Sequence, residues 1–325
     1  MKFIVYREYG SPDVLKFEEI EKPTPKDDEV LIRIRAASVN PLDWRLMGGK
    51  PLLARLMMGG LRKPKVTRPG VDVAGRVEAV GRNVTQFKPG DEVFGSCRGS
   101  FAEYGCTPES ALVIKPADVT FEQAASVPVA AITALQGLRD KGLIQRGHKV
   151  IVVGASGGVG TFAVQIAKSF GAEVTAVCST RNVETARSIG ADHVIDYTRE
   201  DFTKSGKRYD LVFAANAHRS ILAYRRVLGQ NGIYVMAGGG WSQILQGVLL
   251  GPLLSRIGGR KMIFLVAKLN KTDLVLLKDL LATGKIVPVI DRRYLFSEVA
   301  EAFRYVEKEH AKGKVVITME HLSET

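Results

Sequence analysis

The stretch VIVVGASGGVGTFAVQIAK, residues 150–168, contains an apolar strand, a glycine-rich turn and the beginning of a helix. Glycines are needed where a backbone turns sharply and where it approaches a pyrophosphate closely, and a helix N-terminus offers N–H groups to that anion. The spacing Gly154-x-x-Gly157-x-x-Gly160 departs from G-x-G-x-x-G, with Ser156 near the usual second glycine. Strand, turn and helix nevertheless follow in the order that a dinucleotide-binding unit requires.

The glycine-rich turn belongs to a longer series in which strands alternate with helices. Helical composition or spacing is found over residues 130–138 and 159–170. Such alternation indicates right-handed βαβ units and a parallel sheet. The strands that the pattern predicts are Lys149–Val153, Val174–Cys178, His193–Asp196, Tyr209–Ala214 and Gly232–Met236.

The residues before this series are rich in β-structure. Val30–Arg35 alternates apolar and polar residues as a half-buried strand does, and Pro-Gly and Gly punctuation separates further short strands. Such a pattern is typical of a small barrel or sandwich. We therefore predict an α/β protein in which a nucleotide-binding domain, residues 123–268, is inserted in a β-rich domain, residues 1–122 plus 269–325.

A second interpretation of the turn is a hydrolase. Gly154-Ala155-Ser156-Gly157-Gly158 also satisfies G-x-S-x-G, the elbow that exposes a nucleophilic serine in α/β-hydrolases. That chemistry needs a later acid and a later histidine, for which His193, His218 and His310 are available. The sequence lacks an upstream HGGG-like run, and about 120 β-rich residues before the sheet fit this fold poorly. The hydrolase is the minor alternative.

Composition excludes several classes of protein. The 325 residues carry a formal net charge of +12, but the basic residues are scattered and lack aromatic interleaving, so no nucleic-acid partner is expected. Cys97, Cys106 and Cys178 form neither a disulfide framework nor a C-x-x-C site, which fits a reducing compartment. We find no signal peptide and no apolar run of about 18 residues, so the expected location is the cytoplasm.

The end of the second predicted strand indicates which dinucleotide is bound. NAD-specific sites place Asp or Glu here for the ribose 2′-hydroxyl. This chain has Ser179-Thr180-Arg181-Asn182 instead. A carboxylate would repel a 2′-phosphate, whereas hydroxyls and a guanidinium hold it by charge-assisted hydrogen bonds. NADPH is therefore the expected cofactor.

Motifs along nearly the whole chain resemble one known superfamily. They are AASVNPLDWRLMGG (36–49), RPGVDVAGRVEAVG (68–81), KPGDEVFG (88–95), VPVAAITALQGL (127–138), VGASGGVG (153–160), CSTRN (178–182), SIGADHVIDY (188–197) and AKGKVVI (311–317). The chain resembles the medium-chain dehydrogenase/reductase superfamily, and within it the zinc-free quinone oxidoreductase and alkenal/enone reductase branch. The resemblance implies a Rossmann-type parallel-sheet domain inserted in a GroES-like β-rich catalytic domain.

The resemblance also locates the position of zinc in the zinc-dependent members. They would have cysteine at Asn40 and Gly-His-Glu at Gly70-Val71-Asp72. Val71 cannot coordinate a metal, and an asparagine is a poor ligand for zinc. Without a Lewis acid, the substrate has to be electrophilic already, as a quinone or a conjugated enone or enal is. A 2-enoyl thioester reductase and a non-catalytic NADPH-responsive protein that binds RNA or a membrane remain alternatives.

Site residues are assigned by the resemblance, position by position. Asn40, Asp43 and Trp44 are the expected catalytic or substrate-contacting residues: Asn40 polarises a substrate oxygen, Asp43 orients a neighbour or caps the helix after Pro41, and Trp44 lines the pocket. The expected cofactor contacts are Arg45, Thr133, Ser156, Gly157, Gly158, Val159, Ser179, Thr180, Arg181, Asn182, Tyr197, Ala237, Phe264, Leu265, Val266, Gly313 and Lys314.

One apolar segment, Trp241–Lys261, has no counterpart among these motifs. A cover for the substrate pocket or a contact in a homodimer is the preferred interpretation, and a homodimer is what the resemblance implies. Peripheral contact with an anionic membrane is the minority hypothesis. Gly247, Gly251 and Pro252 are expected to interrupt a long helix here, which weakens the membrane hypothesis.

Overall fold

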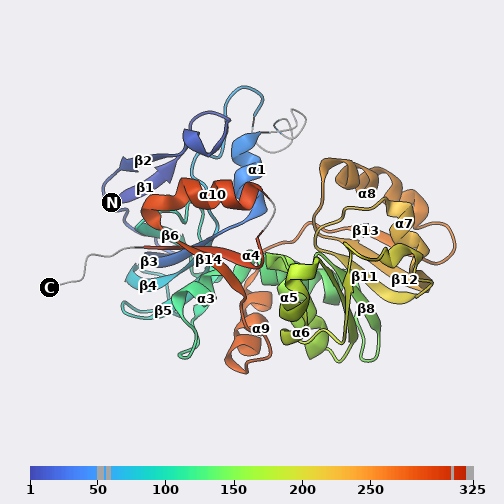
Figure 1. The fold of residues 1–325 in the computed structure, drawn as a ribbon. Coiled ribbons are helices and arrows are strands. Elements are labelled where there is room, and N and C mark those ends of the chain that lie inside the picture. Colours follow the sequence, from blue (N-terminus) through green and yellow to red (C-terminus); the bar gives the residue numbers. More distant parts are fainter. Residues whose placement is uncertain (50–54, 56–59, 309–310, 320–325) are drawn as a thin grey trace. The chain divides into compact units, whose positions relative to one another are not determined.

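The computed structural model describes residues 1–49, 55, 60–308 and 311–319 (Figure 1). The chain forms two compact units. The first contains Met1–Val129, Leu269–Ala282 and Ile290–Thr325, and the second contains Ala130–Lys268 and Thr283–Val289. The division at Lys268 and Leu269 is the predicted one, whereas the second unit begins at Ala130 rather than at the predicted residue 123. The change of unit falls inside a helix that begins at Pro128, and residues 283–289 return to the second unit.

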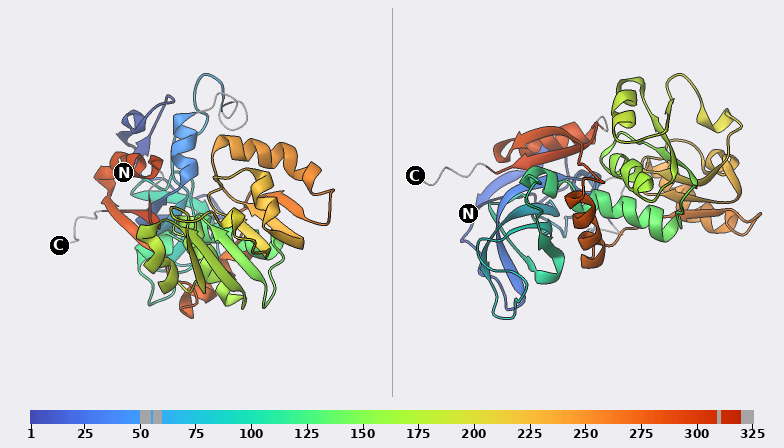
Figure 2. Two further views of the ribbon diagram at one scale, coloured as in Figure 1. Left: turned by 45° about the vertical axis from the view of Figure 1, so that its right-hand side comes forward. Right: turned by 90° about the horizontal axis from the view of Figure 1, so that it is seen from below.

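The second unit is built on a six-stranded parallel sheet (Figures 1 and 2). The spatial order is β10-β9-β8-β11-β12-β13, and every neighbouring pair is parallel. The strands are β8 (Lys149–Val153), β9 (Glu173–Cys178), β10 (His193–Asp196), β11 (Tyr209–Ala214), β12 (Leu228–Met236) and β13 (Lys261–Phe264). The helices are α5 (Gly158–Ser169), α6 (Val183–Ser188), α7 (Ile221–Arg226) and α8 (Trp241–Leu254).

The strand order reverses direction at β8. The chain moves from β8 to β9 and β10 on one side, and then to β11, β12 and β13 on the other. Ligands of open parallel sheets bind outside the carboxyl ends of the strands at such a switch point. The glycine-rich turn after β8 lies at this point, so the topology places it where a dinucleotide is expected.

The first unit is a mostly antiparallel β-structure. Its seven-stranded sheet has the order β14-β15-β3-β4-β5-β7, and β6 pairs with β3. The strands are β3 (Glu29–Val39), β4 (Asp72–Val80), β5 (Glu92–Ser96), β6 (Tyr104–Pro108), β7 (Leu112–Ile114), β14 (Ile290–Leu295) and β15 (Lys314–Thr318), and β1 (Lys2–Val5) pairs with β2 (Lys16–Glu19). The helices are α1 (Pro41–Gly48), α3 (Phe121–Ala125), α9 (Lys271–Ala282) and α10 (Val299–Glu307), and α4 (Pro128–Gln136) passes from this unit into the second.

The core of the first unit explains why α10 folds there. Val299, Phe303 and Val306 of α10 are buried and belong to one apolar cluster with inward-facing residues of β3, such as Ile32 and Ile34. Phe101 and Phe303 pack edge to face, with ring centroids 5.6 Å apart. An amphipathic helix is stabilised mainly by burying such a face.

The expectation that glycines and proline would break the segment after Trp241 is wrong. Residues 241–254 form the continuous helix α8, which contains Gly247, Gly251 and Pro252. Both glycines are buried, and a Cβ on Gly247 would lie 3.2 Å from the sulfur of Met236. They therefore let the helix approach the sheet, and Pro252, which lies in the last turn, removes one intrahelical hydrogen bond without ending the helix.

Candidate functional site

Buried polar side chains form a hydrogen-bonded network where β3, β4 and β15 lie side by side in the first unit. Asn40 follows β3 and donates from Nδ2 to Asp72 Oδ2 over 2.8 Å, while its Oδ1 accepts from Lys314 Nζ over 2.7 Å. Lys314 Nζ also lies 3.3 Å from Asp72 Oδ2, and Ser38 Oγ donates to the same oxygen over 2.6 Å. Lys314 is 3% exposed and Asp72 is fully buried. Buried charges are tolerated when they are paired and hydrogen-bonded in this way.

Strand register explains why these residues meet. Ser38 of β3 is opposite Asp72 of β4 on one side and opposite Val316 of β15 on the other. The beginning of β15 therefore lies beside the end of β3, and Lys314 reaches Asn40 although 274 positions separate them in the sequence. The sheet thus gathers an ammonium, a carboxylate and an amide within hydrogen-bonding distance.

Asp43 links helix α1 to the loop that precedes β4. Its Oδ2 accepts from the backbone N–H of Asn40 over 2.8 Å, and its Oδ1 accepts from that of Gly70 over 3.2 Å. Burial raises the pKa of Asp43 to about 7, and the charge of Asp72 adds to that shift. Both carboxyl oxygens are thus engaged by backbone groups. The structure gives Asp43 a capping and linking position, and a catalytic role stays a prediction.

The residues at the expected zinc position do not fit a zinc ion. Asp72 already accepts at Oδ2 from three side chains and at Oδ1 from the backbone N–H of Val129 over 2.9 Å. The ammonium of Lys314 beside it would repel a second cation. Zinc prefers thiolate and imidazole ligands, and Asn40 and Val71 supply neither. Within residues 1–49, 55, 60–308 and 311–319, no group of three or more His, Cys, Asp and Glu side chains is arranged to hold a metal ion.

The glycine-rich turn of the second unit has the geometry of a phosphate-binding site. Gly154 has a φ of +79°, and a Cβ on Gly160 would lie 2.0 Å from the carbonyl oxygen of Gly154. Gly157 is the N-cap of the 12-residue helix α5, so Gly158 and Val159 form its first turn. The first amides of a helix have no acceptor within the helix and point outward. These residues therefore fit a bound pyrophosphate.

Asn182 donates hydrogen bonds to two serine hydroxyls beside the glycine-rich turn. Its Nδ2 donates to Ser156 Oγ over 3.0 Å and to Ser179 Oγ over 3.1 Å. Because the amide supplies both hydrogens, each hydroxyl accepts from Asn182 and keeps its own proton for another acceptor. Asn182 is 4% exposed, and its Oδ1 has no hydrogen-bond partner among the described residues. Ser156 thus contacts an amide rather than a histidine, which is not the arrangement of a hydrolase nucleophile.

A carboxylate from a neighbouring strand lies beside the end of β9, although none follows β9 directly in the sequence. Thr180 Oγ1 donates to Asp196 Oδ2 over 2.5 Å, so its hydroxyl faces this carboxylate. That hydrogen bond lowers the pKa of Asp196, and Arg199 Nε lies 3.5 Å from the same carboxyl group. Asp196 is opposite Cys178 in the parallel register, and this pairing is the signal that would have revealed it in the sequence. Thr180 is therefore tied to a neighbouring strand rather than directed outward.

The other expected cofactor residues differ in exposure. Arg181 is exposed and Tyr197 is 45% exposed, so both are available to a ligand. Leu265 is buried and packs against Gly137, where an added Cβ would meet its side chain at 3.2 Å, and its expected cofactor contact stays a prediction. Val266, by contrast, is 72% exposed. Thr133 on α4, Ala237 after β12 and Phe264 at the end of β13 are partly buried.

The remaining expected residues belong to the first unit. Trp44 packs against its apolar core, and Trp44 Nε1 has no hydrogen-bond partner among the residues that the structure describes. The guanidinium carbon of Arg45 lies 5.3 Å from the centroid of the Trp44 ring. Gly313, with a φ of +139°, precedes Lys314 and allows the chain to turn into β15. Trp44 therefore has a core contact that does not require a substrate.

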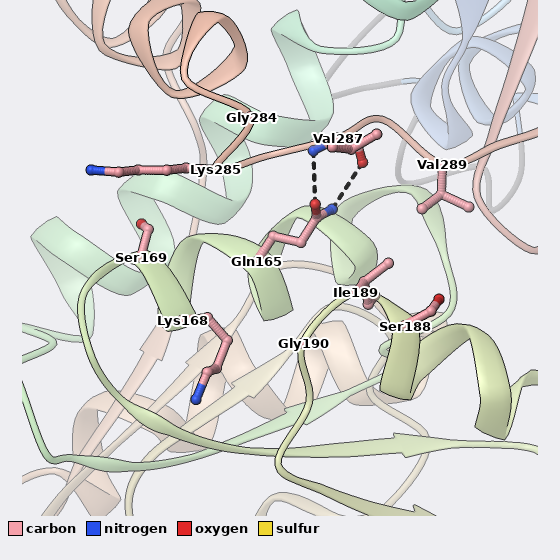
Figure 3. Close-up of a pocket in the computed structure, with 10 residues that line it drawn as sticks. All are labelled: Gln165, Lys168, Ser169, Ser188, Ile189, Gly190, Gly284, Lys285, Val287 and Val289. Atoms are coloured by element: carbon pink, nitrogen blue, oxygen red, sulfur yellow. Dashed lines mark hydrogen bonds between the residues drawn. The ribbon is translucent and has the colours of Figure 1, made fainter.

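An open pocket of about 750 Å³ in the second unit lies away from all these residues (Figure 3). It is formed by the carboxyl-terminal ends of α5 and α6 and by residues 284–289. Gln165 crosses it, accepting from Val287 N over 2.7 Å and donating to Val287 O over 3.0 Å. The carboxyl ends of helices carry partial negative charge, which disfavours phosphate. The pocket therefore lies at the end of α5 opposite to the glycine-rich turn.

Comparisons with known proteins agree with this geometry. Residues 26–117 match the family described as alcohol dehydrogenase GroES-like domain, and residues 189–317 match the one described as zinc-binding dehydrogenase. The chain is 37% identical to 2-methylene-furan-3-one reductase of Solanum lycopersicum and to NADPH-dependent alkenal/one oxidoreductase, chloroplastic, of Arabidopsis thaliana. Each match covers 98% of this chain and 79% of the relative. The structure of the quinone oxidoreductase from Coxiella burnetii superposes with a TM-score of 0.84 at 27% identity, covering 98% of this chain and 99% of that one.

The chain belongs to the medium-chain dehydrogenase/reductase superfamily, in its quinone and alkenal/enone oxidoreductase branch. The expected Rossmann-type domain inserted in a GroES-like domain is confirmed. As a member of this superfamily, the protein is a pyridine-nucleotide-dependent oxidoreductase. Among the described residues, no helix is both long enough and apolar enough to cross a membrane.

Proposed function

We propose that this protein uses NADPH to reduce quinones, or the C=C bond of conjugated enones and enals, without zinc. The observation that carries the proposal is the contact of Lys314 Nζ with Asn40 and Asp72, at 2.7 and 3.3 Å, where the zinc-dependent members bind their metal. A site with an ammonium in this position suits a substrate that is electrophilic by itself. The relatives from tomato and Arabidopsis, named for a furanone and for alkenals and alkenones, support the same substrate class.

The residues around the glycine-rich turn support NADPH over NADH. When bound, the reduced dinucleotide supplies the hydride. Ser156 and Ser179, with their oxygens held by Asn182, would donate hydrogen bonds to phosphate oxygens, and exposed Arg181 would pair with the 2′-phosphate. The carboxylate of Asp196 is engaged by Thr180, which reduces its repulsion of such a phosphate.

Asn40 is the group that we assign to the substrate oxygen. A primary amide has two N–H groups, and Nδ2 uses one for Asp72. The second would donate to the carbonyl or quinone oxygen, which becomes more negative as hydride arrives. The ammonium of Lys314 on Asn40 Oδ1 polarises the amide and strengthens this donor. No side-chain acid is assigned to the product proton, which water would supply.

The test is NADPH oxidation by the full chain against quinones, 2-alkenals, cyclic enones and enoyl thioesters. The saturated analogue of each unsaturated compound is the matched control. We expect oxidation with the conjugated compounds and background rates with the saturated ones. Equal rates with saturated aldehydes would contradict the proposal. Turnover of enoyl thioesters alone would assign the protein to that substrate class, and NADPH binding without any turnover would favour a non-catalytic member.

Assembly and location remain proposals. β13 is the last strand in the order of the parallel sheet, so a second copy could extend the sheet there as a homodimer. We retain the cytoplasm as the expected location and a small electrophile, with no nucleic acid, as the expected partner. Three of the similar plant proteins are named as chloroplastic, so the compartment needs its own test by fractionation of cells that express the tagged full chain.

A further inference from the structure

Helix α8 is apolar on the face turned to solvent as well as on the face turned to the sheet. Gly247 and Gly251 are buried against the sheet. On the opposite face, Leu245, Leu249 and Leu253 recur every four residues and are 55%, 63% and 57% exposed. A surface helix of a globular protein normally presents polar residues on this side. The exposed side of α8 therefore has the composition of a buried one.

Neighbouring side chains widen this apolar surface. Leu222 of α7, which lies beside α8, is 57% exposed, and Ile257 after α8 is 56% exposed (Figures 1 and 2). Contiguous exposed apolar patches are uncommon in monomeric proteins and mark sites of interaction. The α8 face is defined here as Leu222, Trp241, Leu245, Val248, Leu249, Leu253 and Ile257.

The charge around the α8 face is of one sign. Residues 211–272 contain no Asp or Glu but have eight basic residues, Arg219, Arg225, Arg226, Arg256, Arg260, Lys261, Lys268 and Lys271. Arg256 follows α8 directly, Arg225 donates to the carbonyl oxygen of Ile257, and Arg260 donates to that of Gly229. Several of the eight therefore lie around the carboxyl end of α8. Basic residues at a helix C-terminus complement its dipole, but that effect does not account for 62 consecutive residues without an acid.

The uniform charge favours one kind of occupant. In a symmetric contact made by the α8 face itself, as distinct from strand pairing at the edge of β13, the same patch would face itself, so its basic residues would be brought together and repel each other. An anionic lipid surface attracts these residues and receives the exposed leucines between its headgroups. Apolar side chains bordered by basic ones are the pattern of helices that lie in a membrane interface rather than across it.

We propose that the α8 face docks on the surface of a bilayer that contains anionic phospholipids, with α8 parallel to the membrane plane. The docked leucines enter the headgroup region, and Arg226, Arg256 and Lys261, which are exposed, contact lipid phosphates. This proposal concerns location and is independent of the reduction reaction, because none of these residues belongs to the assigned substrate or cofactor site.

The experiment is co-sedimentation of the full chain with vesicles of phosphatidylcholine and phosphatidylglycerol, compared with vesicles of phosphatidylcholine alone. We expect binding to the anionic vesicles and little to the others. Raising the ionic strength from about 0.1 M to about 1 M shortens the screening length from about 10 Å to about 3 Å and should release much of the protein.

Two variants separate the apolar contribution to vesicle binding from the electrostatic one. The first replaces three exposed leucines, Leu245→Gln, Leu249→Gln and Leu253→Gln, and should lower the vesicle partition coefficient at least about tenfold. The second removes three exposed charges, Arg226→Gln, Arg256→Gln and Lys261→Gln, and should lower it about 100-fold, at about fivefold for each residue. Matched controls that change exposed residues elsewhere are Leu61→Gln, Ile114→Gln and Leu295→Gln, and Lys141→Gln, Lys149→Gln and Lys207→Gln.

The outcomes are distinguishable. Unchanged NADPH binding by all four variants shows that they are folded. Equal binding of the native protein to both kinds of vesicle, or to neither, overturns the proposal. If the leucine variant dissociates a dimer in analytical ultracentrifugation and the native protein ignores vesicles, the α8 face belongs to a second copy instead. Loss of vesicle binding only in the two α8-face variants supports lipid docking.

Discussion

Lys314 and Asp72 form an ion pair inside the first unit, with Nζ 3.3 Å from Oδ2 and side-chain exposures of 3% and 0%. Each charge is removed from water, so each depends on the other and on the hydrogen bonds of Asn40 and Ser38. Removing one member of a buried pair leaves an uncompensated charge, which costs more than the pair gains by forming.

Replacing Lys314 should therefore destabilise the protein strongly. We expect Lys314→Met to lower the free energy of unfolding by about 3–5 kcal/mol, because Asp72 is left charged and buried. Urea denaturation monitored by circular dichroism measures the change. Exposed Lys312→Met is the matched control and should stay within about 0.5 kcal/mol of the native protein. The double variant Lys314→Met/Asp72→Asn should recover part of the loss, and no recovery would contradict the pairing.

Asp43 should make stability depend on pH. Burial raises its pKa from 3.8 to about 7, so between these values the folded state binds a proton that the unfolded state has released. Its stabilising contribution is present below pH 3.8 and is lost as the pH rises through about 7. The free energy of unfolding of the native protein, relative to Asp43→Asn, should fall by roughly 2–3 kcal/mol between about pH 5 and about pH 8. The same substitution at exposed Asp118 is the control, and a difference for Asp43→Asn that stays constant with pH would refute the prediction.

Asn182 should orient the hydroxyls of Ser156 and Ser179 so that both donate hydrogen bonds to a bound dinucleotide. Asn182→Asp keeps the shape but turns a donor into an acceptor, so the serine hydroxyls would donate inward and a negative charge would face the phosphates. We expect the dissociation constant for NADPH, measured by isothermal titration calorimetry, to rise at least about 100-fold. Exposed Asn231→Asp introduces the same charge and should change affinity little. Equal losses in the two variants would mean that charge alone is responsible.

Arg181 should discriminate between the two dinucleotides. A lost charge-assisted hydrogen bond to the 2′-phosphate costs about 1.5–3 kcal/mol, so Arg181→Ala should weaken NADPH binding about 10- to 100-fold. NADH, which lacks that phosphate, should bind within about twofold of its original affinity. Arg187→Ala, an exposed arginine on α6, is the control. An equal loss of affinity for NADH and NADPH would mean that Arg181 does not contact the 2′-phosphate.

Two glycines of one turn should respond differently to alanine. A Cβ on Gly160 would lie 2.0 Å from Gly154 O, whereas a Cβ on Gly157 meets that oxygen at 3.6 Å. Gly160→Ala should therefore lower the free energy of unfolding by about 1–3 kcal/mol, and Gly157→Ala should fold normally. Thermal unfolding of the two variants tests this, and equal melting temperatures would show that α5 shifts freely away from β8.

Much of the fold could be predicted because local patterns determine it. The strands Lys149–Val153, His193–Asp196 and Tyr209–Ala214 begin and end where hydrophobic runs and turn residues predict. The spacing of apolar residues also predicts the helix after the glycine-rich turn. In the structure α5 is covered on all sides, since every residue from 160 to 167 is buried, including the polar Thr161 and Gln165.

Contacts between distant segments could not be predicted in this way. Lys314 meets Asn40 only because β15 pairs with β3, and Asp196 meets Thr180 only because β10 pairs with β9. The continuity of α8 likewise depends on Met236 and Met262, which accept two helical glycines against the sheet. Propensity alone penalises glycine in a helix, and tertiary packing overrides it here.

The ammonium of Lys314 makes a metal site at this position difficult to build. The substitutions Asn40→Cys and Val71→His would supply two metal ligands, but the ammonium of Lys314 would remain beside them and repel the metal ion. Removing the ammonium first would leave the buried charge of Asp72 without a counterion. Adding the ligands first would place a metal ion beside the ammonium, which repels it. Neither order of single substitutions avoids both problems, so we expect a metal site here to require replacement of Lys314 together with introduction of the ligands.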